Sequence, residues 1–313
     1  MQPFSHETVL LYETVDALQV KPDGIYLDGT AGGGGHSEQI AKRLTVGHLY
    51  ATDVDPDAVK AATARLAGLP ATVLHGSYAD LDRLLDAENV DRLDGMVLDL
   101  GVSSHQLDER ERGFSYKMDA PLDMRMGGEG PTAADVLANY SKQELIRILR
   151  DYGDERFAGP IASAIVARRE KEPLTDTLQL AELVASCYPA AKRRDGNPAR
   201  KTFQALRMEV NRETDNIRRG ITAGFARLKP GGRLAVITFH SLEDRIVKTL
   251  FKEYLAGCIC DKSAPVCVCG RTPRARLVTR KPVLPSAEEV EHNRRSRSAR
   301  LRVIEKIKDS PYG

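Results

Sequence analysis

The chain has 313 residues, of which 42% are hydrophobic and 29% are charged, and its formal net charge is +2 at pH 7. This apolar content suffices for one large folded domain or two smaller ones, which excludes a disordered protein. No stretch approaches the roughly 20 apolar residues of a membrane helix, and the N-terminus lacks a basic-then-apolar signal sequence, so we expect a soluble, cytoplasmic protein without a membrane partner.

The first hundred residues alternate short apolar runs with segments of helical spacing. The runs cover residues 24–28, 48–53, 71–75 and 95–100, and residues 57–67 carry apolar side chains at helical intervals. This alternation predicts β-α-β-α units in a doubly wound parallel sheet.

A glycine-rich segment, DGTAGGGGH, occupies residues 28–36, where the first strand turns into the first helix. Glycines there allow a ligand to approach the backbone closely. No lysine occurs between Tyr26 and Ala41, which argues against a P-loop, and a G-x-G-x-x-G match requires choosing a frame. The loop therefore favours S-adenosylmethionine, with Asp28 near the charged amino-acid end of the cofactor.

Two further strand ends carry candidate cofactor ligands. Asp53 ends the second strand and is the better candidate for the ribose hydroxyls, because Asp55, just before Pro56, is suited to cap a helix. Tyr78 follows the third strand and places an aromatic ring where an adenine could stack; a partly buried structural tyrosine is the alternative.

The fourth strand ends at Asp99, where we expect the reacting group. An exocyclic amine conjugated to a base is a poor nucleophile, so the enzyme must accept its hydrogen bonds while aligning the nitrogen with the methyl group. Asp99 and the following carbonyls are suitable acceptors. The Asp/Asn-Pro-Pro-aromatic pattern of many amino-methyltransferases is absent, and Phe114 and Tyr116 are candidates for a stacking platform.

The central part of the chain is predicted to be helical. Residues 141–144 form a capping box, and further helices are expected over 155–169 and around 178–184. Apolar spacing from Phe203 to Phe225 predicts one long helix. After it come a tight turn at residues 229–233, a strand over 234–239, a helix over 242–254 and a last strand around Leu301.

Charged and thiol side chains gather in three places. Two basic clusters are typical of a phosphate-binding surface, although charge runs are commonly solvated faces. The first comprises Lys192, Arg193, Arg194, Arg200 and Lys201, and the second comprises Arg294, Arg295, Arg297, Arg300 and Arg302. Four of the five cysteines form a C-x-C array over residues 258–269, which suits a reducing compartment and has enough thiols for tetrahedral zinc. The sequence alone leaves the zinc question open, and we assign no metal.

Several long motifs in the same order give a family resemblance. They are DGT (28–30), GGH (34–36), LDLGVSS (98–104), ERGFS (111–115), PLDMRM (121–126), TFQALR (202–207) and FHSLEDR (239–245). With these motifs the chain closely resembles the bacterial 16S ribosomal RNA cytosine-N4 methyltransferases, the RsmH or MraW type, over nearly its whole length.

The resemblance implies S-adenosylmethionine-dependent methylation of N4 of a cytosine in the decoding region of 16S ribosomal RNA, with the small ribosomal subunit as partner. It implies an α/β fold, a Rossmann-like class I methyltransferase sheet over 1–104 and 201–313 with an all-helical RNA-recognition insertion over 105–200. The expected cofactor-binding residues are Gly34, Gly35, His36, Asp53, Tyr78, Asp99 and Gln106, and the expected catalytic residues are Asp99, Ser103 and His240.

Three alternatives and two local questions stay open at this stage. A methyltransferase of DNA or protein, an NAD-dependent oxidoreductase and an RNA-binding scaffold are the rival functions. His240 could orient the base, relay a proton or be structural, and Ser241 with Asp244 is predicted to cap a helix. Asp123 and Arg125 are predicted to form an ion pair that is either buried or faces substrate.

Overall fold

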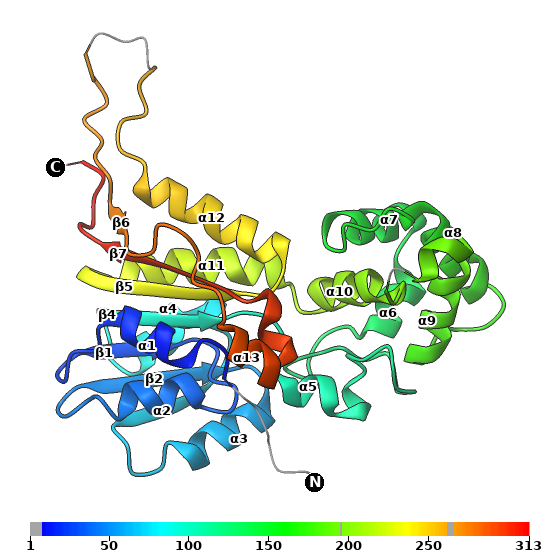
Figure 1. Cartoon of the computed structure of the whole chain (residues 1–313), viewed down its shortest axis with the longest axis horizontal. Coiled ribbons are helices and arrows are strands. Elements are labelled where there is room, and N and C mark those ends of the chain that lie inside the picture. Colours follow the sequence, from blue (N-terminus) through cyan, green and yellow to red (C-terminus); the bar gives the residue numbers. More distant parts are fainter. Residues whose placement is uncertain (1–7, 195, 262–265, 313) are drawn as a thin grey trace. The chain divides into compact units, whose positions relative to one another are not determined.

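The computed structural model describes residues 8–194, 196–261 and 266–312, except for the side chains of residues 193 and 194. Contacts within the chain divide it into two units, one formed by residues 1–101 and 214–313 and the other by residues 102–213 (Figure 1). We call them the sheet unit and the helical unit and describe each by itself.

Among its described residues, the sheet unit contains one seven-stranded sheet with the order β3-β2-β1-β4-β5-β7-β6. Strands β1 to β5 are parallel, whereas β7 is antiparallel to both of its neighbours. The strands are β1 (Ile25–Asp28), β2 (His48–Asp53), β3 (Ala71–His75), β4 (Leu93–Asp99), β5 (Leu228–Thr238), β6 (Ala275–Leu277) and β7 (Arg300–Lys306). This topology confirms the predicted Rossmann-like α/β sheet.

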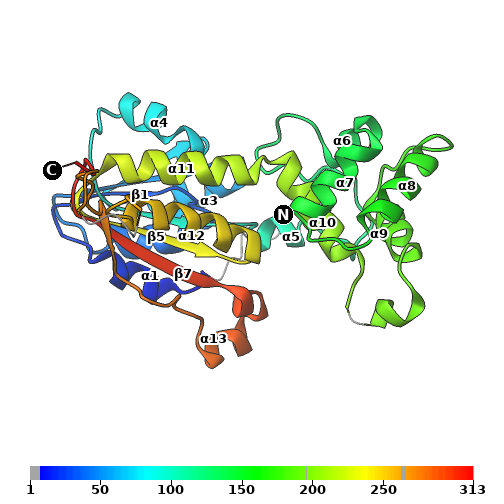
Figure 2. The same ribbon diagram turned by 90° about the horizontal axis from the view of Figure 1, so that it is seen from above.

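Helices cover both faces of this sheet because neighbouring strand residues point to opposite sides. Leu27 packs in a core with α4 (Leu81–Ala87), α11 (Glu213–Arg227) and α12 (Ser241–Leu255), whereas Tyr26 packs with α1 (Leu11–Leu18), α2 (Gly35–Ala41) and α3 (Pro56–Arg65) (Figure 2). The short helix α13 (Ala287–His292) precedes β7. None of the described helices combines the length and apolarity needed to cross a membrane.

A buried lysine joins the last strand to the end of α11. The ammonium group of Lys306 donates hydrogen bonds to the carbonyls of Phe225, Ala226 and Leu228 at 3.0, 2.8 and 2.7 Å. It also lies 2.7 Å from Asp309, and burial lowers its pKa. The charge therefore satisfies carbonyls that a helix C-terminus leaves without partners inside the helix.

The helical unit has its own apolar core. Its helices are α5 (Ser104–Asp108), α6 (Ala133–Asn139), α7 (Lys142–Asp151), α8 (Ala158–Arg169), α9 (Thr177–Ser186) and α10 (Ala199–Val210). The predicted capping box of α7 is confirmed, since Ser141 and Glu144 exchange side-chain and backbone hydrogen bonds.

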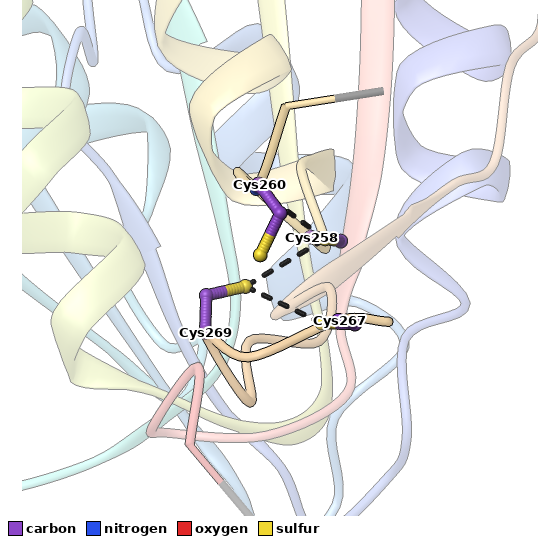
Figure 3. A group of neighbouring side chains, drawn as sticks. All are labelled: Cys258, Cys260, Cys267 and Cys269. Carbon is purple, nitrogen blue, oxygen red and sulfur yellow. Dashed lines mark hydrogen bonds between the residues drawn. The ribbon is translucent and has the colours of Figure 1, made fainter. Parts of the chain in front are cut away.

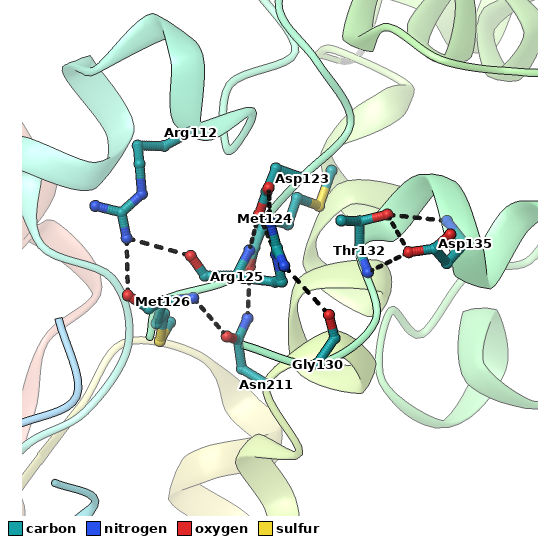
Figure 4. A network of polar contacts seen from close by, with 9 residues as sticks. All are labelled: Arg112, Asp123, Met124, Arg125, Met126, Gly130, Thr132, Asp135 and Asn211. Carbon is teal, nitrogen blue, oxygen red and sulfur yellow. Dashed lines mark hydrogen bonds and ion pairs between the residues drawn. The ribbon is translucent and has the colours of Figure 1, made fainter. Parts of the chain in front are cut away.

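The long helix predicted over residues 203–225 is wrong. The chain leaves the helix between α10 and α11, where Arg212 has a positive φ of 50°. The side chain of Asn211 accepts a hydrogen bond from the amide of Met126 at 2.8 Å and donates one to the carbonyl of Met124 at 2.7 Å (Figure 4). Because α10 packs in the core of the helical unit, that unit ends at Glu213, whereas the insertion was expected to end at residue 200.

The turn predicted at residues 229–233 lies within the bounds of β5, where it interrupts the ladder with β4. Leu228 pairs with Leu93, and the next pair joins Arg233 to Gly95, so the ladder is irregular between them. Gly231 has φ of 84°, a left-handed conformation that glycine adopts readily.

Candidate cofactor and catalytic site

Acidic side chains end three neighbouring strands of the sheet unit. Asp28, Asp53 and Asp99 are the last residues of β1, β2 and β4, and β1 lies between the other two strands. The carboxyl ends of parallel strands share one edge, and the sequence order reverses at β1 and β4, which is where open α/β sheets bind ligands. The predicted positions of the three acids are thereby confirmed.

The glycine-rich turn after β1 is held by backbone hydrogen bonds to the neighbouring strands. The amide of Gly29 donates to Val97 at 3.0 Å, and that of Ala31 donates to Thr52 at 2.9 Å. Gly34 has φ of 78°, and a Cβ at Gly35 would overlap the side chain of Thr8. Both positions therefore require glycine for local reasons; Gly34 is the N-cap of α2, which begins at Gly35.

The buried carboxylate of Asp28 stabilises this turn through hydrogen bonds. Its carboxylate accepts hydrogen bonds from the Thr30 amide at 3.1 Å and from the Ser37 hydroxyl at 2.6 Å, and its side chain is buried. Burial raises the pKa of Asp28. The side chain thus connects the end of β1 to the first turn of α2.

Asp53 is partly exposed and fixes the other side of the same turn. One carboxylate oxygen accepts a hydrogen bond from Gly32 at 2.9 Å and the other accepts one from Asp55 at 2.9 Å. Desolvation raises the pKa of Asp53 to about 6. Asp55 itself caps α3 by accepting from Asp57, as predicted. Each carboxylate oxygen has a second lone pair, so Asp53 keeps acceptor capacity for a hydroxyl donor.

Asp99 carries a buried acceptor that the chain does not satisfy. Its Oδ1 is buried and has no hydrogen-bond partner among the described residues, and Oδ2 lies 3.9 Å from Nδ1 of His36. Burial, with the charges of Asp28 and Glu243, raises the pKa of Asp99 well above its ordinary value. Buried acceptors are normally paired, so this atom points to a donor supplied by a bound molecule.

The Thr30 hydroxyl, which sequence reasoning missed, accepts a hydrogen bond from the Asp99 amide at 2.6 Å. The turn after β1 is thereby tied to the end of β4. Thr30 stands in the DGT motif, but the motif does not predict this contact, because the contact joins strands that are distant in the chain.

Tyr78 is half-buried and packs closely against glycines. A Cβ added at Gly220 of α11 would lie 2.3 Å from the Tyr78 ring, and one at Gly29 would lie 2.9 Å from the Tyr78 Cβ. The position of the Tyr78 ring therefore requires that residue 220 has no side chain. Sequence reasoning missed Gly220, because a glycine inside a helix does not by itself indicate a ligand site.

Ser103 and Gln106 form a capping box at the start of α5 in the helical unit. The Ser103 hydroxyl accepts from the Gln106 amide, and the Gln106 side chain accepts from the Ser103 amide, both at 3.1 Å. This arrangement gives both side chains a structural role at the helix start. Their predicted catalytic and cofactor-binding roles remain hypotheses.

His240 caps α12 in the sheet unit. Its Nδ1 accepts from the amide of Glu243 at 3.4 Å, and its Nε2 lies 2.9 Å from Oε1 of Glu243. The cap predicted for Ser241 with Asp244 is therefore wrong by one residue. Asp244 instead pairs with Arg302 at 2.6 Å. A structural role for His240 follows from this geometry, and a catalytic role remains a hypothesis.

Phe114 and Tyr116, the two aromatic residues suggested as a stacking platform, pack against other residues of the helical unit. Phe114 is buried in the core, and the ring of Tyr116 contacts that of Phe203 edge-on with centroids 5.6 Å apart. A loop beside them is also well fixed: Asp123 and Arg125 form a half-buried ion pair at 2.6 Å, and Arg112 donates to the Arg125 carbonyl (Figure 4). Phe114 is therefore not available as the suggested platform.

Each of the two predicted basic clusters includes a side chain that contacts other residues of the chain. Lys201 donates to the Asp154 carbonyl at 2.6 Å, and Arg302 is paired with Asp244. Arg294 and Arg297 are exposed. The side chains of Arg193 and Arg194 lie outside the described part of the structure.

Comparison with known proteins gives similarity over almost the whole chain. Proteins named "Ribosomal RNA small subunit methyltransferase H" are 50% identical in Pelobacter propionicus, with 98% of this chain and 100% of the relative covered, and 49% identical in Lachnospira eligens, with 97% and 98% covered. A relative of the same name in Clostridium botulinum is 48% identical, with 97% and 99% covered. The model of the MraW methylase family matches residues 3–307. The chain therefore belongs to the MraW methylase family.

Proposed function

We propose that this chain transfers a methyl group from S-adenosylmethionine to N4 of a cytosine in the decoding region of 16S ribosomal RNA. The names of its relatives support a small-subunit ribosomal RNA substrate. The family resemblance of the motifs supports the cytosine-N4 position. The single observation that carries the proposal is the buried, unsatisfied Oδ1 of Asp99 at the carboxyl end of β4.

The residues at the sheet edge fit the proposed cofactor. Asp53 has acceptor capacity and would hold the ribose hydroxyls, the Tyr78 ring would stack on the adenine, and Asp28 would lie near the amino-acid end of the cofactor. Gly34, Gly35 and His36 start α2, and Asp99 ends β4 at the same edge of the sheet. The family resemblance adds Gln106 of the helical unit to the proposed set. When bound, S-adenosylmethionine supplies a methyl group activated by a positively charged sulfur.

Asp99 has two tasks in this proposal. First, it accepts a hydrogen bond from the amino group of the cytosine and so orients the nitrogen. Second, methylation would form one N–C bond, break the bond between the methyl group and the donor sulfur, and release one proton from the nitrogen; a carboxylate whose pKa is raised is a suitable acceptor for that proton. The base must be unpaired or flipped out for its amino group to reach the site.

The helical unit is the proposed RNA-recognition part, because the motifs of the cofactor turn lie outside it and the basic run from Lys192 to Lys201 lies within it. Its size favours recognition of a folded substrate over a short single strand. The substrate also places the proposed activity in the cytoplasm, where ribosomal subunits are assembled and used.

The test uses small ribosomal subunits from cells that lack this gene, the purified protein and a labelled methyl donor. We expect one methyl group per subunit, which mass mapping locates on N4 of one decoding-region cytosine. A short oligonucleotide of the same sequence should be a poor substrate. Transfer to DNA or to a ribosomal protein instead of RNA would contradict the proposal and favour another acceptor.

A second measurement tests the cofactor independently of the substrate. Titration calorimetry should detect binding of S-adenosylmethionine and no binding of NAD. The reverse result would favour an oxidoreductase. Binding of neither compound would favour an RNA-binding scaffold.

A further inference from the structure

Four cysteines converge in the segment between α12 and β6. Cys258 and Cys260 lie on one arm of this segment, and Cys267 and Cys269 lie on the other (Figure 3). The Sγ atoms of Cys267 and Cys269 are 3.6 Å apart, and those of Cys269 and Cys258 are 3.7 Å apart. All four sulfur atoms lie within 4.8 Å of one another.

These separations match a tetrahedral site for one metal ion. Zinc binds thiolates at about 2.3 Å, and four ligands at that distance in a tetrahedron are about 3.8 Å from each other. A disulfide would require a sulfur–sulfur distance of about 2.0 Å. A cluster of several iron and sulfide ions would hold the thiolates further apart than a single ion does. The observed spacing therefore favours one ion bound by four thiolates.

The arms are anchored at their base but lack an apolar core at the cysteines. At the base, the Arg274 amide donates to the Tyr254 carbonyl at 2.9 Å. Near the cysteines, Ile259, Val266 and Val268 are 60, 69 and 87% exposed. The four thiols thus face one another between arms whose described apolar side chains near the cysteines are exposed, and a metal cross-link would hold these arms together.

Backbone amides are already directed at two of the sulfur atoms. The amide of Ile259 donates to Sγ of Cys269 at 3.5 Å, and that of Cys260 donates to Sγ of Cys258 at 3.4 Å. Such donors stabilise the negative charge of thiolate ligands and orient them. The bond from Ile259 to Cys269 joins the two arms, whereas the bond from Cys260 to Cys258 lies within one arm.

We propose that Cys258, Cys260, Cys267 and Cys269 bind one Zn²⁺ ion as a structural tetrathiolate site. Thiolates select zinc over magnesium and calcium, which prefer oxygen ligands. Four protein ligands leave no open position for substrate, so the ion serves the fold and takes no part in methyl transfer. The site is separate in the chain from the residues proposed to hold the methyl donor.

The experiment measures metal content of the full chain purified under reducing conditions. We expect one zinc ion per chain by mass spectrometry. After exchange, Co²⁺ should give the absorption bands of a tetrahedral tetrathiolate. The double variant Cys258→Ser with Cys269→Ser should lose the ion. The control variant Cys187→Ser should keep it, because Cys187 is the fifth cysteine and lies in the helical unit, outside the proposed site.

A further readout separates loss of the site from loss of the fold. The double variant should keep the circular dichroism and the S-adenosylmethionine affinity of the parent, while limited proteolysis between residues 256 and 274 becomes at least tenfold faster. The proposal would be overturned if the parent chain held iron in place of zinc, or if it were folded and held no metal. Disulfides among these cysteines, found after the protein has been reduced and the reductant removed by desalting, would also overturn it. Equal zinc content in parent and double variant would also overturn it.

Discussion

The Asp53 carboxylate accepts a hydrogen bond from the Gly32 amide at 2.9 Å, which fixes the acidic end of β2 to the glycine-rich turn that follows β1. The same carboxylate accepts from Asp55 at the start of α3. One side chain therefore sets the position of two chain segments beside the proposed ribose site, and its substitution affects binding through both.

The variant Asp53→Ala should weaken S-adenosylmethionine binding by about 1–3 kcal/mol, because hydrogen bonds to a partly buried carboxylate are lost. Titration calorimetry measures this difference directly. Asp57→Ala, an exposed acid on the next helix, is the matched control and should bind like the parent. Equal affinity of the parent and Asp53→Ala would remove Asp53 from the site.

Cofactor affinity should fall as the pH is lowered through about 6. The pKa of Asp53 is raised to about 6 by burial, so protonation below that pH removes the charged acceptor that the ribose hydroxyls require. Calorimetry across this range should show a decline for the parent and a flatter profile for Asp53→Asn. An identical decline in both proteins would assign the effect to another group.

The variant Asp99→Asn should lower the rate of methyl transfer by roughly 10²–10³-fold, the effect typical of removing a group that stabilises a transition state. Single-turnover assays with bound cofactor give this rate.

Stability provides the control for Asp99. Because its folded-state pKa is raised, the folded chain binds this proton more tightly than the unfolded chain, and stability falls as the pH rises above the ordinary aspartate value. Asp99→Asn removes that penalty, so urea unfolding at neutral pH should show equal or greater stability than the parent. A clearly less stable variant would contradict this account of Asp99.

Replacing Arg193 and Arg194 together by alanine should weaken binding to the small subunit and reduce its dependence on salt, since fewer counterions are released from the RNA. Filter binding over a series of salt concentrations measures the slope. The control pair Arg150→Ala with Arg168→Ala removes the same charge from α7 and α8. An unchanged slope for the first pair would make that run a solvated face.

The variant Asn211→Ala should destabilise the helical unit by about 1–3 kcal/mol. Met126 and Met124 would each lose a hydrogen-bond partner at the break between α10 and α11. Denaturant unfolding measures the change, and Asn139→Ala, at the exposed end of α6, is the matched control. Similar stability of the two variants would show that the break is set by something other than Asn211.

Local patterns predicted the elements that local chemistry determines. Strands β1 to β4 follow from short apolar runs, and α7 follows from Ser141 and Glu144 three residues apart. The break at Asn211 could not be predicted, because helical periodicity continues through it and the bonds that stabilise the break come from residues 124 and 126. The sequence also placed the cap of α12 one residue late, since a histidine is an unusual capping residue.

The same distinction applies to the candidate site. Asp28, Asp53 and Asp99 could be placed at one edge because strand ends in a parallel sheet are determined by topology. The contact of Tyr78 with Gly220 joins segments far apart in the chain. The capping pair Ser103 and Gln106 has the spacing of a capping box, which predicts a helix start, whereas the family resemblance implies a catalytic role for Ser103 and a cofactor-binding role for Gln106.

The order of the sheet constrains how the protein is made. On a ribosome, β4 emerges with β1 as its neighbour, and its other neighbour, β5, follows only after the whole of residues 102–213. During that interval β4 has an open edge, the kind of surface that pairs with foreign strands. Because synthesis runs from the N-terminus, the helical unit can fold before the sheet is complete. The sheet is completed late, when β7 inserts between β5 and β6 and Lys306 reaches the end of α11.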